Sequence, residues 1–537
     1  MKPHPMLLTL STLVVALASA ALMLLGGCAS LPQPVGQRYS EARRDVADSA
    51  LARVAAATLA EVGDPSMSAE RGAMSGLRLL PDGADALEAR LALLRAAEKS
   101  IDAQYYLVAD DRSGRQFAHG LRDAAARGVR VRLLVDDLNA GATKGLLAEL
   151  ASHDNVELRM FNPLPVRTGS LHARVLLSLH KLDRVNRRMH NKLLVADNSF
   201  AITGGRNIAD EYFGRSQPAN FIDMDVLMAG AAVRELSDVF DGYWNSALAY
   251  PLQSLVDVQG IVKEHAKMAA GLPMPIVPRA AQDDEARDGL GAQLAQQRVR
   301  LQPAQVRVVA DTVAQPEPGG NPDTALREGF VMRANLELLQ SARQEALVVS
   351  PYLVPMPRML AAFGAASAGG ARISVVTNSL ATTDEPLAHY GYARYRQALV
   401  GMGIALYELM PVNGARTDHH SVTHQGSLAR LHAKLAVVDR RWFYVGSMNM
   451  DRRSAHCNTE LGLVVDSPAL AGELVDMIQR EHFDMSYSVR RRLETGGIEW
   501  TAREGGRDLR MTRDPTIGWA QRFGWSLLSS LIDEDYL

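Results

Sequence analysis

The chain has 537 residues, of which 47% are apolar and 22% are charged, as in a folded globular protein. This length exceeds one ordinary hydrophobic core, so we expect two domains or two halves. The 58 basic and 60 acidic residues give a formal net charge of −2, without the basic excess typical of nucleic-acid-binding proteins. We therefore expect no nucleic acid partner.

The N-terminus has the pattern of an export signal. Lys2 precedes an apolar run that ends in Gly-Gly-Cys28-Ala29-Ser. A charged start, an apolar core and small residues before a cut mark a secretory signal. The cysteine resembles the acylated residue of a bacterial lipobox. The alternative is a retained transmembrane anchor, in which Gly-Gly-Cys would be an unusual interior.

We expect residues 1–28 to be a lipoprotein signal with lipid on Cys28, which places the protein on a periplasmic membrane face. In the lipoprotein sorting rules that this pattern resembles, an aspartate after the cysteine retains a protein in the inner membrane. Ala29 stands there instead, which favours the outer membrane.

The next segments alternate helical and strand patterns. Residues 29–76 are alanine-rich and predict a helical lead-in or tether. Helical spacing over 84–99 leads into a strand at 101–108, and a helix over 117–127 leads into a buried strand at 129–135. This alternation predicts an α/β layer architecture for a first module spanning 77–251.

A proline-rich stretch separates this module from the rest. We interpret residues 252–305 as an irregular linker, 306–500 as a second module and 501–537 as an amphipathic tail. Trp519 and Phe523 begin an apolar line at i, i+4 spacing in this tail. That line predicts either an interfacial helix or a helix docked on the body of the protein.

Two segments of the chain repeat each other at a constant offset. The first contains His190-x-Lys192 and the second contains His432-x-Lys434. Five polar or glycine positions match, and the members of each pair differ by 242 in residue number. The matched pairs are His190 and His432, Lys192 and Lys434, Asp197 and Asp439, Gly204 and Gly446, and Asn207 and Asn449. The chain is therefore a duplicated module rather than two unrelated domains.

The repeated pattern predicts a hairpin that carries reactive side chains. Positions i and i+2 of a strand face the same way, so each histidine should project beside its lysine. Gly205 and Ser447 allow the backbone to approach a ligand, and Asn207 and Asn449 can donate side-chain N–H groups to it. We expect Asp197 and Asp439 to brace the hairpin at its turn.

Pairing the two halves would bring both sets of residues into one pocket that suits a phosphate diester. Lysines and amides would stabilise the charge on the non-bridging oxygens. One neutral histidine can attack phosphorus while the other gives a proton to the leaving oxygen. A single His-x-Lys on a strand is more often solvent-exposed than functional, but two copies with matching Gly and Asn favour a site. No metal and no cofactor is expected.

The paired motif resembles the double His-x-Lys-x-x-x-x-Asp signature of the phospholipase D superfamily. The segments around Gln104-Tyr-Tyr106, His190-Asn-Lys192, Asp210-Glu-Tyr-Phe213 and Asn458-Thr-Glu460 resemble the C-type cardiolipin synthases of bacteria. The resemblance implies two phospholipase D-like modules with one active site at their interface. It also implies phosphatidyl transfer between phospholipids, with phosphatidylglycerol and phosphatidylethanolamine as substrates.

The resemblance also implies roles for single residues. His190 would be the nucleophile that forms a covalent phosphatidyl-histidine, and His432 would be the general acid and then the base. The six residues His190, Lys192, Asp197, His432, Lys434 and Asp439 form the signature. An acidic residue after each motif holds the second nitrogen of a histidine, and Asp225 and Glu460 fit that role.

Three functions remain open at this point. The first is a phosphatidyltransferase that makes cardiolipin. The second is a hydrolytic phospholipase D, or a phosphodiesterase or nuclease of the same superfamily, since water can reach the same intermediate. The third is a non-catalytic lipoprotein that binds lipid headgroups, which two intact motifs argue against. Tyr106, Tyr352 and Asn378 are candidates for selecting the acceptor, because they end buried strands near the motifs.

Overall fold

The computed structural model describes residues 31–62, 74–167, 169–178, 181–269, 289–313, 329–411, 427–492, 494–504 and 507–515. Cys28 and the expected tail helix from Trp519 onward lie outside these ranges. Among the described residues, no helix is both long enough and apolar enough to cross a membrane.

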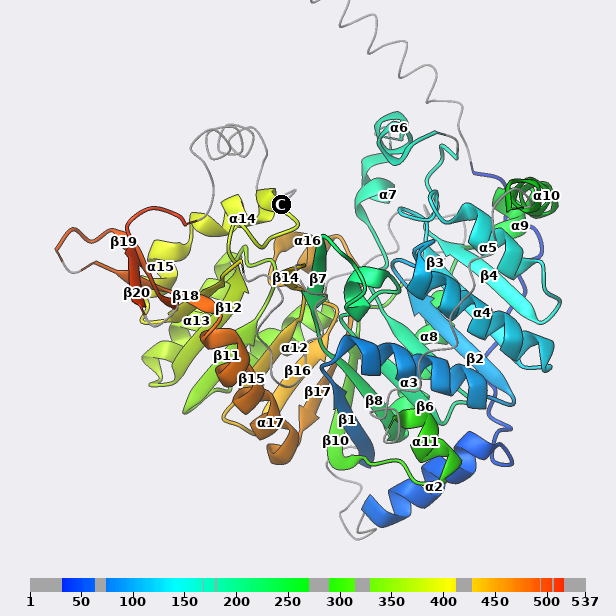
Figure 1. The fold of residues 1–537 in the computed structure, drawn as a ribbon, viewed down its shortest axis with the longest axis horizontal. Helices are drawn as coiled ribbons and strands as arrows, with labels where there is room; N and C mark the ends of the chain where they lie inside the picture. Colours follow the sequence, from blue (N-terminus) through cyan, green and yellow to red (C-terminus); the bar gives the residue numbers. More distant parts are fainter. Residues whose placement is uncertain are drawn as a thin grey trace, which may run out of the picture.

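The first half of the chain supplies one side of a continuous 18-stranded sheet (Figure 1). Its strands run from the outer edge to the centre as follows: β9 (Ala249–Pro251), β4 (Val156–Phe161), β3 (Arg130–Asp136), β2 (Ser100–Tyr105), β5 (Leu193–Ala196), β6 (Phe200–Gly204), β8 (Asp225–Gly230) and β1 (Met74–Leu80).

The second half continues the sheet outward from β1. Its strands follow in the order β10 (Gln302–Ala310), β17 (Leu461–Asp466), β16 (Trp442–Gly446), β15 (Leu435–Val438), β11 (Glu345–Val349), β12 (Arg372–Asn378), β13 (Ala405–Leu409), β18 (Ser486–Arg491), β19 (Ile498–Glu504) and β20 (Arg507–Met511).

The two halves repeat one strand order on either side of the central antiparallel pair β1–β10. In each half three parallel strands, β2–β3–β4 or β11–β12–β13, lie beside the hairpin that follows the His-x-Lys motif. The parallel strands have helical crossovers, as parallel strands require. The predicted duplicated α/β architecture is confirmed.

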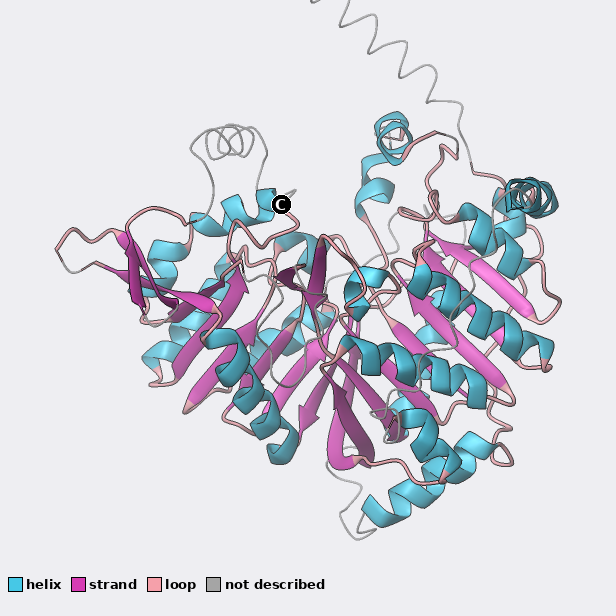
Figure 2. Cartoon of the chain, viewed as in Figure 1, coloured by secondary structure: helices cyan, strands magenta, loops and turns pink. Residues whose placement is uncertain are grey.

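Helices cover both faces of the sheet (Figure 2). Their bounds are α2 (Ala50–Val62), α3 (Gly83–Ala96), α4 (Arg112–Ala126), α5 (Lys144–Ala151), α6 (Leu171–Leu177), α7 (Leu182–Asn186), α8 (Ala231–Trp244), α9 (Leu252–Leu255), α10 (Val258–Ala269), α11 (Leu290–Ala295), α12 (Phe330–Gln340), α13 (Pro357–Ala368), α14 (Pro386–Ala393), α15 (Arg396–Gly401), α16 (Arg452–His456) and α17 (Pro468–Ile478).

One hydrophobic core continues across the boundary between the halves. On this face of the sheet, α8 buries Leu236 and Phe240 and α17 buries Leu474, against strands from both modules. The opposite face has separate cores: α3, α4 and α5 cover the first half, and α12 and α13 cover the second. The halves therefore cannot separate without exposing the shared core, which fixes the relative positions of their motifs.

The predicted boundaries differ from the structure at the two connecting segments. The segment expected as a helical lead-in or tether contains a docked helix: α2 buries Leu51 and Val54 in the first core, and Ser40 hydrogen-bonds to Asn245. The described residues of the expected linker contain helices α9, α10 and α11 and the first residues of β10. Both β1 and β10 are central strands, because each pairs across the boundary between the modules.

Each motif hairpin has a turn in left-handed backbone conformation. The turns contain Asp197 at a φ of 47° and Asp439 at a φ of 52°. The histidines and lysines lie in extended chain directly before β5 and β15, rather than within these strands as predicted. The turn aspartates lie at the other end of the strands.

Both turn aspartates bind backbone amides. The carboxylate of Asp197 accepts hydrogen bonds from the N–H groups of Lys99 and Ser100 at 2.8 and 2.9 Å. Asp439 accepts equivalent bonds from Gln344 and Glu345 at 2.8 and 3.0 Å. Although the signature includes both aspartates, these contacts join the hairpin to the start of the neighbouring parallel strand and do not touch the histidines.

We expect the substitution Asp197→Ala to destabilise the protein more than Asp439→Ala. Asp197 is fully buried and its loss leaves buried N–H groups without an acceptor, which costs about 3 kcal/mol. Asp439 is partly exposed, so water can replace it at a cost of about 1 kcal/mol. Urea unfolding measures both values. Loss of turnover by the folded variants, with unchanged stability, would instead assign these carboxylates to the chemistry.

Candidate active site

The two motif histidines are each fastened to the opposite half of the chain. The backbone N–H of His190 donates to the carbonyl oxygen of Thr459 at 2.9 Å. The N–H of His432 donates to the carbonyl oxygen of Ile222 at 2.8 Å. The second contact continues a short parallel pairing of β7 (Ala219–Ile222) with β14 (Leu428–Leu431). The fold therefore brings the two motifs together at the module boundary.

The histidine side chains bind carboxylates by the same crossed arrangement. His190 Nδ1 lies 2.9 Å from Oε2 of Glu460, and His432 Nδ1 lies 2.6 Å from Oδ2 of Asp223. Both carboxylates are fully buried. A carboxylate on Nδ1 fixes the ring orientation and leaves Nε2 as the reactive nitrogen.

The role expected for Asp225 belongs to Asp223. Asp225 is the first residue of β8, and its carboxylate binds Arg90 at 2.9 Å and Arg206 at 3.4 Å. These ion pairs are buried and structural. Asp223 and Asp225 are two positions apart, so in an extended chain their side chains would face the same way. Only the tertiary contacts distinguish them. Glu460 lies where the sequence analysis placed it.

The small residues after each hairpin lie against the carboxylates of Asp223 and Glu460. A side chain at Gly205 would meet Asp223, since a Cβ atom there would lie 2.0 Å from the Asp223 carboxylate oxygen Oδ1. At the equivalent position, the Ser447 hydroxyl donates to Glu460. Gly205 and Ser447, which we expect to bind phosphate, therefore also lie against the carboxylates that bind the histidines.

The lysines and amides lie around the histidines. Lys434 Nζ is 3.0 and 3.2 Å from the two ring nitrogens of His432. Each lysine also donates to the carbonyl oxygen of its own histidine. Asn207 donates to the Tyr212 hydroxyl at 2.9 Å, so this amide is already engaged. The Oδ1 atoms of Asn207 and Asn449 are buried without a hydrogen-bond partner among the described residues.

Aromatic rings enclose both histidines. Tyr106 contacts His190 edge-on, with ring centroids 5.3 Å apart. Tyr212 and Phe221 lie against His432 at 5.1 and 4.8 Å. We did not identify Phe221 or Asp223 as site residues. Phe221 lies in β7, which pairs with the strand leading to His432, and Asp223 directly follows β7, so both were placed by a pairing that the sequence alone does not show.

The environments of the two histidines are electrostatically different. Burial above all, with the charge of Lys192, lowers the pKa of His190 well below its usual value, while burial raises the pKa of Glu460 to about 7. Burial and Lys434 also lower the pKa of His432, but Asp223 opposes them. Burial acts to raise the pKa of Asp223, yet His432 and Lys434 outweigh it and hold this pKa at about 2. His432 therefore has a firmly ionised partner.

Both lysines are also perturbed. Burial lowers the pKa of Lys192 to about 7 and that of Lys434 to about 8, against the opposing charges of nearby carboxylates. An anionic phosphate entering the site would favour the charged form of both lysines. The cluster therefore combines two imidazoles in different surroundings with two lysine amines, which suits displacement at a phosphodiester.

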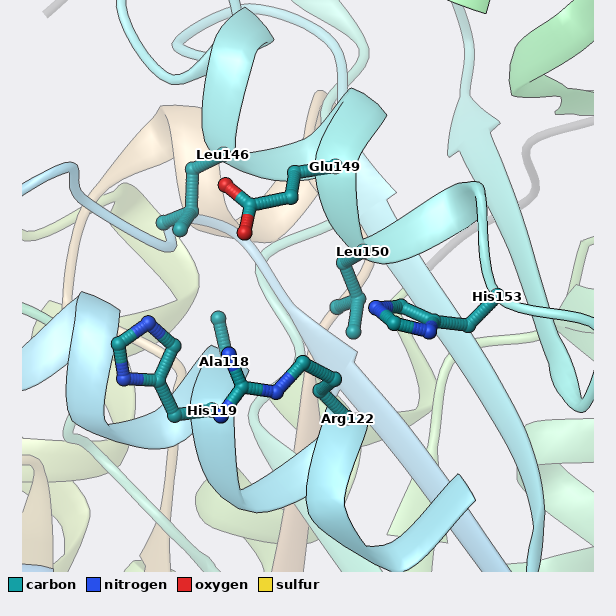
Figure 3. A pocket seen from close by; sticks show the side chains of 7 residues that line it. All are labelled: Ala118, His119, Arg122, Leu146, Glu149, Leu150 and His153. Atoms are coloured by element: carbon teal, nitrogen blue, oxygen red, sulfur yellow. The ribbon is translucent and has the colours of Figure 1, made fainter. Parts of the chain in front are cut away.

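A small surface hollow occurs elsewhere, between α4 and α5. Figure 3 shows His119 and Arg122 of α4 facing Glu149 and Leu150 of α5 across it. It shares no residue with the histidine cluster. The hollow therefore adds nothing to the assignment of the active site.

We expect Asp223→Asn to lower the pKa of His432 further. The ionised carboxylate stabilises the imidazolium, so replacing it by a neutral amide favours the neutral ring, and the titration moves to lower pH. NMR titration of isotope-labelled histidine measures this shift. Asp238→Asn is the control, since this carboxylate is 64% exposed and pairs with Arg44. A rise in the pKa of His432, or no change, would contradict the crossed pair.

Comparisons with known proteins identify the family. The family described as cardiolipin synthase, PLD-like domain, matches residues 91–244 and 336–482. The chain is 33% identical over 459 residues to cardiolipin synthase C of Escherichia coli (strain K12), across 85% of this chain and 95% of that protein. It is 26% identical over 384 residues to a cardiolipin synthase of Geobacillus kaustophilus, across 71% and 61% of the two chains.

A solved structure supports the fold. The crystal structure of phosphatidylserine synthase from Haemophilus influenzae superposes with a TM-score of 0.51 at 12% identity, covering 90% of this chain and 99% of that one. At this identity the likeness shows the fold alone. The two ranges that the family matches, 91–244 and 336–482, each contain one His-x-Lys motif and lie in different halves of the sheet. The chain therefore belongs to the cardiolipin synthase family of PLD-like proteins, within the phospholipase D superfamily.

Proposed function

We propose that this phosphatidyltransferase forms cardiolipin through a covalent phosphatidyl-histidine intermediate on His190. The observation that carries the proposal is the crossed pair of histidine–carboxylate contacts, His190 with Glu460 and His432 with Asp223. It sets two imidazoles with different proton affinities in one site. Phosphatidylglycerol and phosphatidylethanolamine are the proposed substrates, in keeping with the family.

The first step breaks one phosphoester bond and makes a phosphorus–nitrogen bond. Nε2 of neutral His190 attacks the phosphorus of the donor lipid, and the headgroup oxygen leaves with the electron pair of the broken bond. Protonated His432 gives its proton to that oxygen, so the headgroup departs as a neutral alcohol. Lys192 and Lys434 stabilise the charge on the non-bridging oxygens.

The second step reverses these roles. His432, now neutral, takes the proton of an acceptor hydroxyl, which attacks phosphorus and breaks the bond to His190. If the acceptor is the glycerol headgroup of phosphatidylglycerol, the product is cardiolipin. If it is water, the product is phosphatidic acid. Lipid transfer prevails only if the site positions the acceptor well enough to overcome the abundance of water.

The asymmetry of the pKa values supports the order of the two histidines. Burial, followed by the charge of Lys192, shifts the pKa of His190 so far down that its ring is neutral, as a nucleophile must be. Burial and Lys434 also lower the pKa of His432, but the charge of Asp223 acts to raise it, which favours the protonated form that a general acid requires. The pair shares one site, so its pH profile should be bell-shaped with apparent constants that belong to the pair.

We expect mixed phosphatidylglycerol and phosphatidylethanolamine vesicles to yield more cardiolipin than phosphatidic acid. Product analysis of labelled lipids measures the ratio. His190→Ala and His432→Ala should each reduce turnover at least about a hundredfold, and only the variant that retains His190 should form the adduct with a slow substrate. Phosphatidic acid in excess at every acceptor density would make the protein a hydrolase, and full activity of either variant would refute the two-histidine mechanism.

We also propose that the mature protein is anchored by lipid on Cys28 at the periplasmic face of the outer membrane. The support is the lipobox-like pattern alone, with Ala29 after the cysteine. Such a tether would hold the active site close to its lipid substrates at high effective concentration.

We expect the N-terminal peptide of the purified protein to carry acyl chains on Cys28. Mass spectrometry of that peptide measures the modification, and Cys28→Ser, which cannot be acylated, is the control. Cell fractionation identifies the membrane. A peptide that begins at an unprocessed Met1 would contradict the anchoring.

A further inference from the structure

The segment after β12 delivers a carboxylate to the His432 side of the active site. At the end of β12, the Asn378 side chain hydrogen-bonds to both the N–H and the carbonyl oxygen of Leu431, at 2.9 Å each. Leu431 directly precedes His432, so the end of β12 is fixed beside this histidine. Six residues further on, the carboxylate Oδ2 atom of Asp384 accepts a hydrogen bond from the Tyr352 hydroxyl at 2.7 Å.

Asp384 retains an unused acceptor. Its Oδ1 atom is buried and has no hydrogen-bond partner within the described ranges. A buried carboxylate oxygen without a partner is costly, which favours a ligand that supplies a donor. Tyr352, which we considered as a residue that selects the acceptor, engages only the other oxygen of this carboxylate.

The Asp384 carboxylate is close enough to His432 and Lys434 to act on them electrostatically. Burial lowers the pKa of both groups, and the charge of Asp384 is among the influences that raise it again. The Tyr212 ring lies against His432. Burial above all raises the pKa of Tyr212, and the charge of Asp384 adds to the rise. The carboxylate therefore lies near the reacting centre.

The duplicated modules carry opposite charges at one equivalent position. Arg453 lies 242 residues after Glu211, the offset of the repeat. Arg453 is among the cations that add to burial in lowering the pKa of His190. Burial raises the pKa of Glu211, and Asp384 is among the carboxylates that add to the rise. The carboxylates of Glu211 and Asp384 both raise the pKa of Tyr212 in addition to burial, and the Tyr212 ring contacts His432.

Negative charge near His432 matches the direction of the reaction. In the proposed mechanism His432 protonates the oxygen of the departing headgroup, so the headgroup lies on the His432 side. Carboxylates there would repel an anion and attract a cation. The aromatic rings of Tyr212 and Phe221 on the same side are also favourable surfaces for an ammonium group.

We propose that Asp384 binds the ammonium group of the phospholipid headgroup whose ester oxygen receives the proton of His432. The proposal rests on the phosphatidyl transfer proposed above and adds the residue that selects the donor. The ammonium donates one hydrogen bond to the free Oδ1 atom and keeps its proton. The bonds made and broken at phosphorus are those of the first step, and an aminoalcohol is released.

A different result is expected if Asp384 does not contact the headgroup. If this carboxylate only balances the charges of His432 and Lys434, its loss should slow every donor equally. If it binds the headgroup, its loss should slow the cationic donor alone. The ratio of two donors distinguishes these roles.

The test uses phosphatidylethanolamine and phosphatidylpropanol as competing donors in the same vesicle, with phosphatidylglycerol as acceptor. Propanol matches ethanolamine in length but has a methyl group in place of the ammonium. The ratio of released ethanolamine to released propanol does not depend on how much of the enzyme is folded. Asp384→Asn is compared with wild type, with Glu385→Gln, at the neighbouring carboxylate, as the matched control.

We expect wild type and Glu385→Gln to prefer the ethanolamine lipid, and Asp384→Asn to lose about tenfold or more of that preference, with propanol release little changed. Asp384→Glu, which keeps the charge, should retain part of it. Equal slowing of both donors by Asp384→Asn, or a wild-type enzyme without preference, would overturn the proposal. A wild-type enzyme that turns over neither lipid would instead refute the proposed function.

Discussion

The contacts of His190 with Glu460 and of His432 with Asp223 cross the boundary between the two modules, and the active site depends on this crossing. Each half carries the carboxylate that orients the histidine of the other half. A module alone would expose a histidine without its partner and a buried carboxylate without its histidine. Reactivity therefore requires the assembled pair, which gives a physical reason for both motifs to lie in one chain.

The rest of the fold maintains that crossing. The β1–β10 pair makes the two sheets continuous, and the core under α8 and α17 extends over strands of both modules. The residue before each histidine is held by the side chain that ends the adjacent parallel strand. Asp136 accepts from the N–H of Met189 at 2.9 Å, and Asn378 does the same for Leu431. The histidines are thus fixed by both their side chains and their backbones.

The surroundings of the two motifs make the site asymmetric although the sequence is nearly symmetric. The two motifs contain the same residues and both carboxylates are buried, but Glu460 has a raised pKa, whereas Asp223 has a lowered one beside His432 and Lys434. The proposed roles of nucleophile and proton carrier would therefore follow from unequal surroundings rather than from unequal motifs.

The sequence by itself determined the duplication and the α/β class and identified His190, Lys192, His432 and Lys434, because constant spacing and strand periodicity are local properties of the chain. It also indicated Glu460. Only the tertiary structure decided that Asp223 rather than Asp225 supports a histidine, since both aspartates share a strand parity and their partners lie far away in sequence. It likewise revealed that β10 is a central strand and that Asp384 is close enough to His432 to act on it electrostatically. Pairing across modules and the burial of charge depend on contacts between distant segments, which no local pattern specifies.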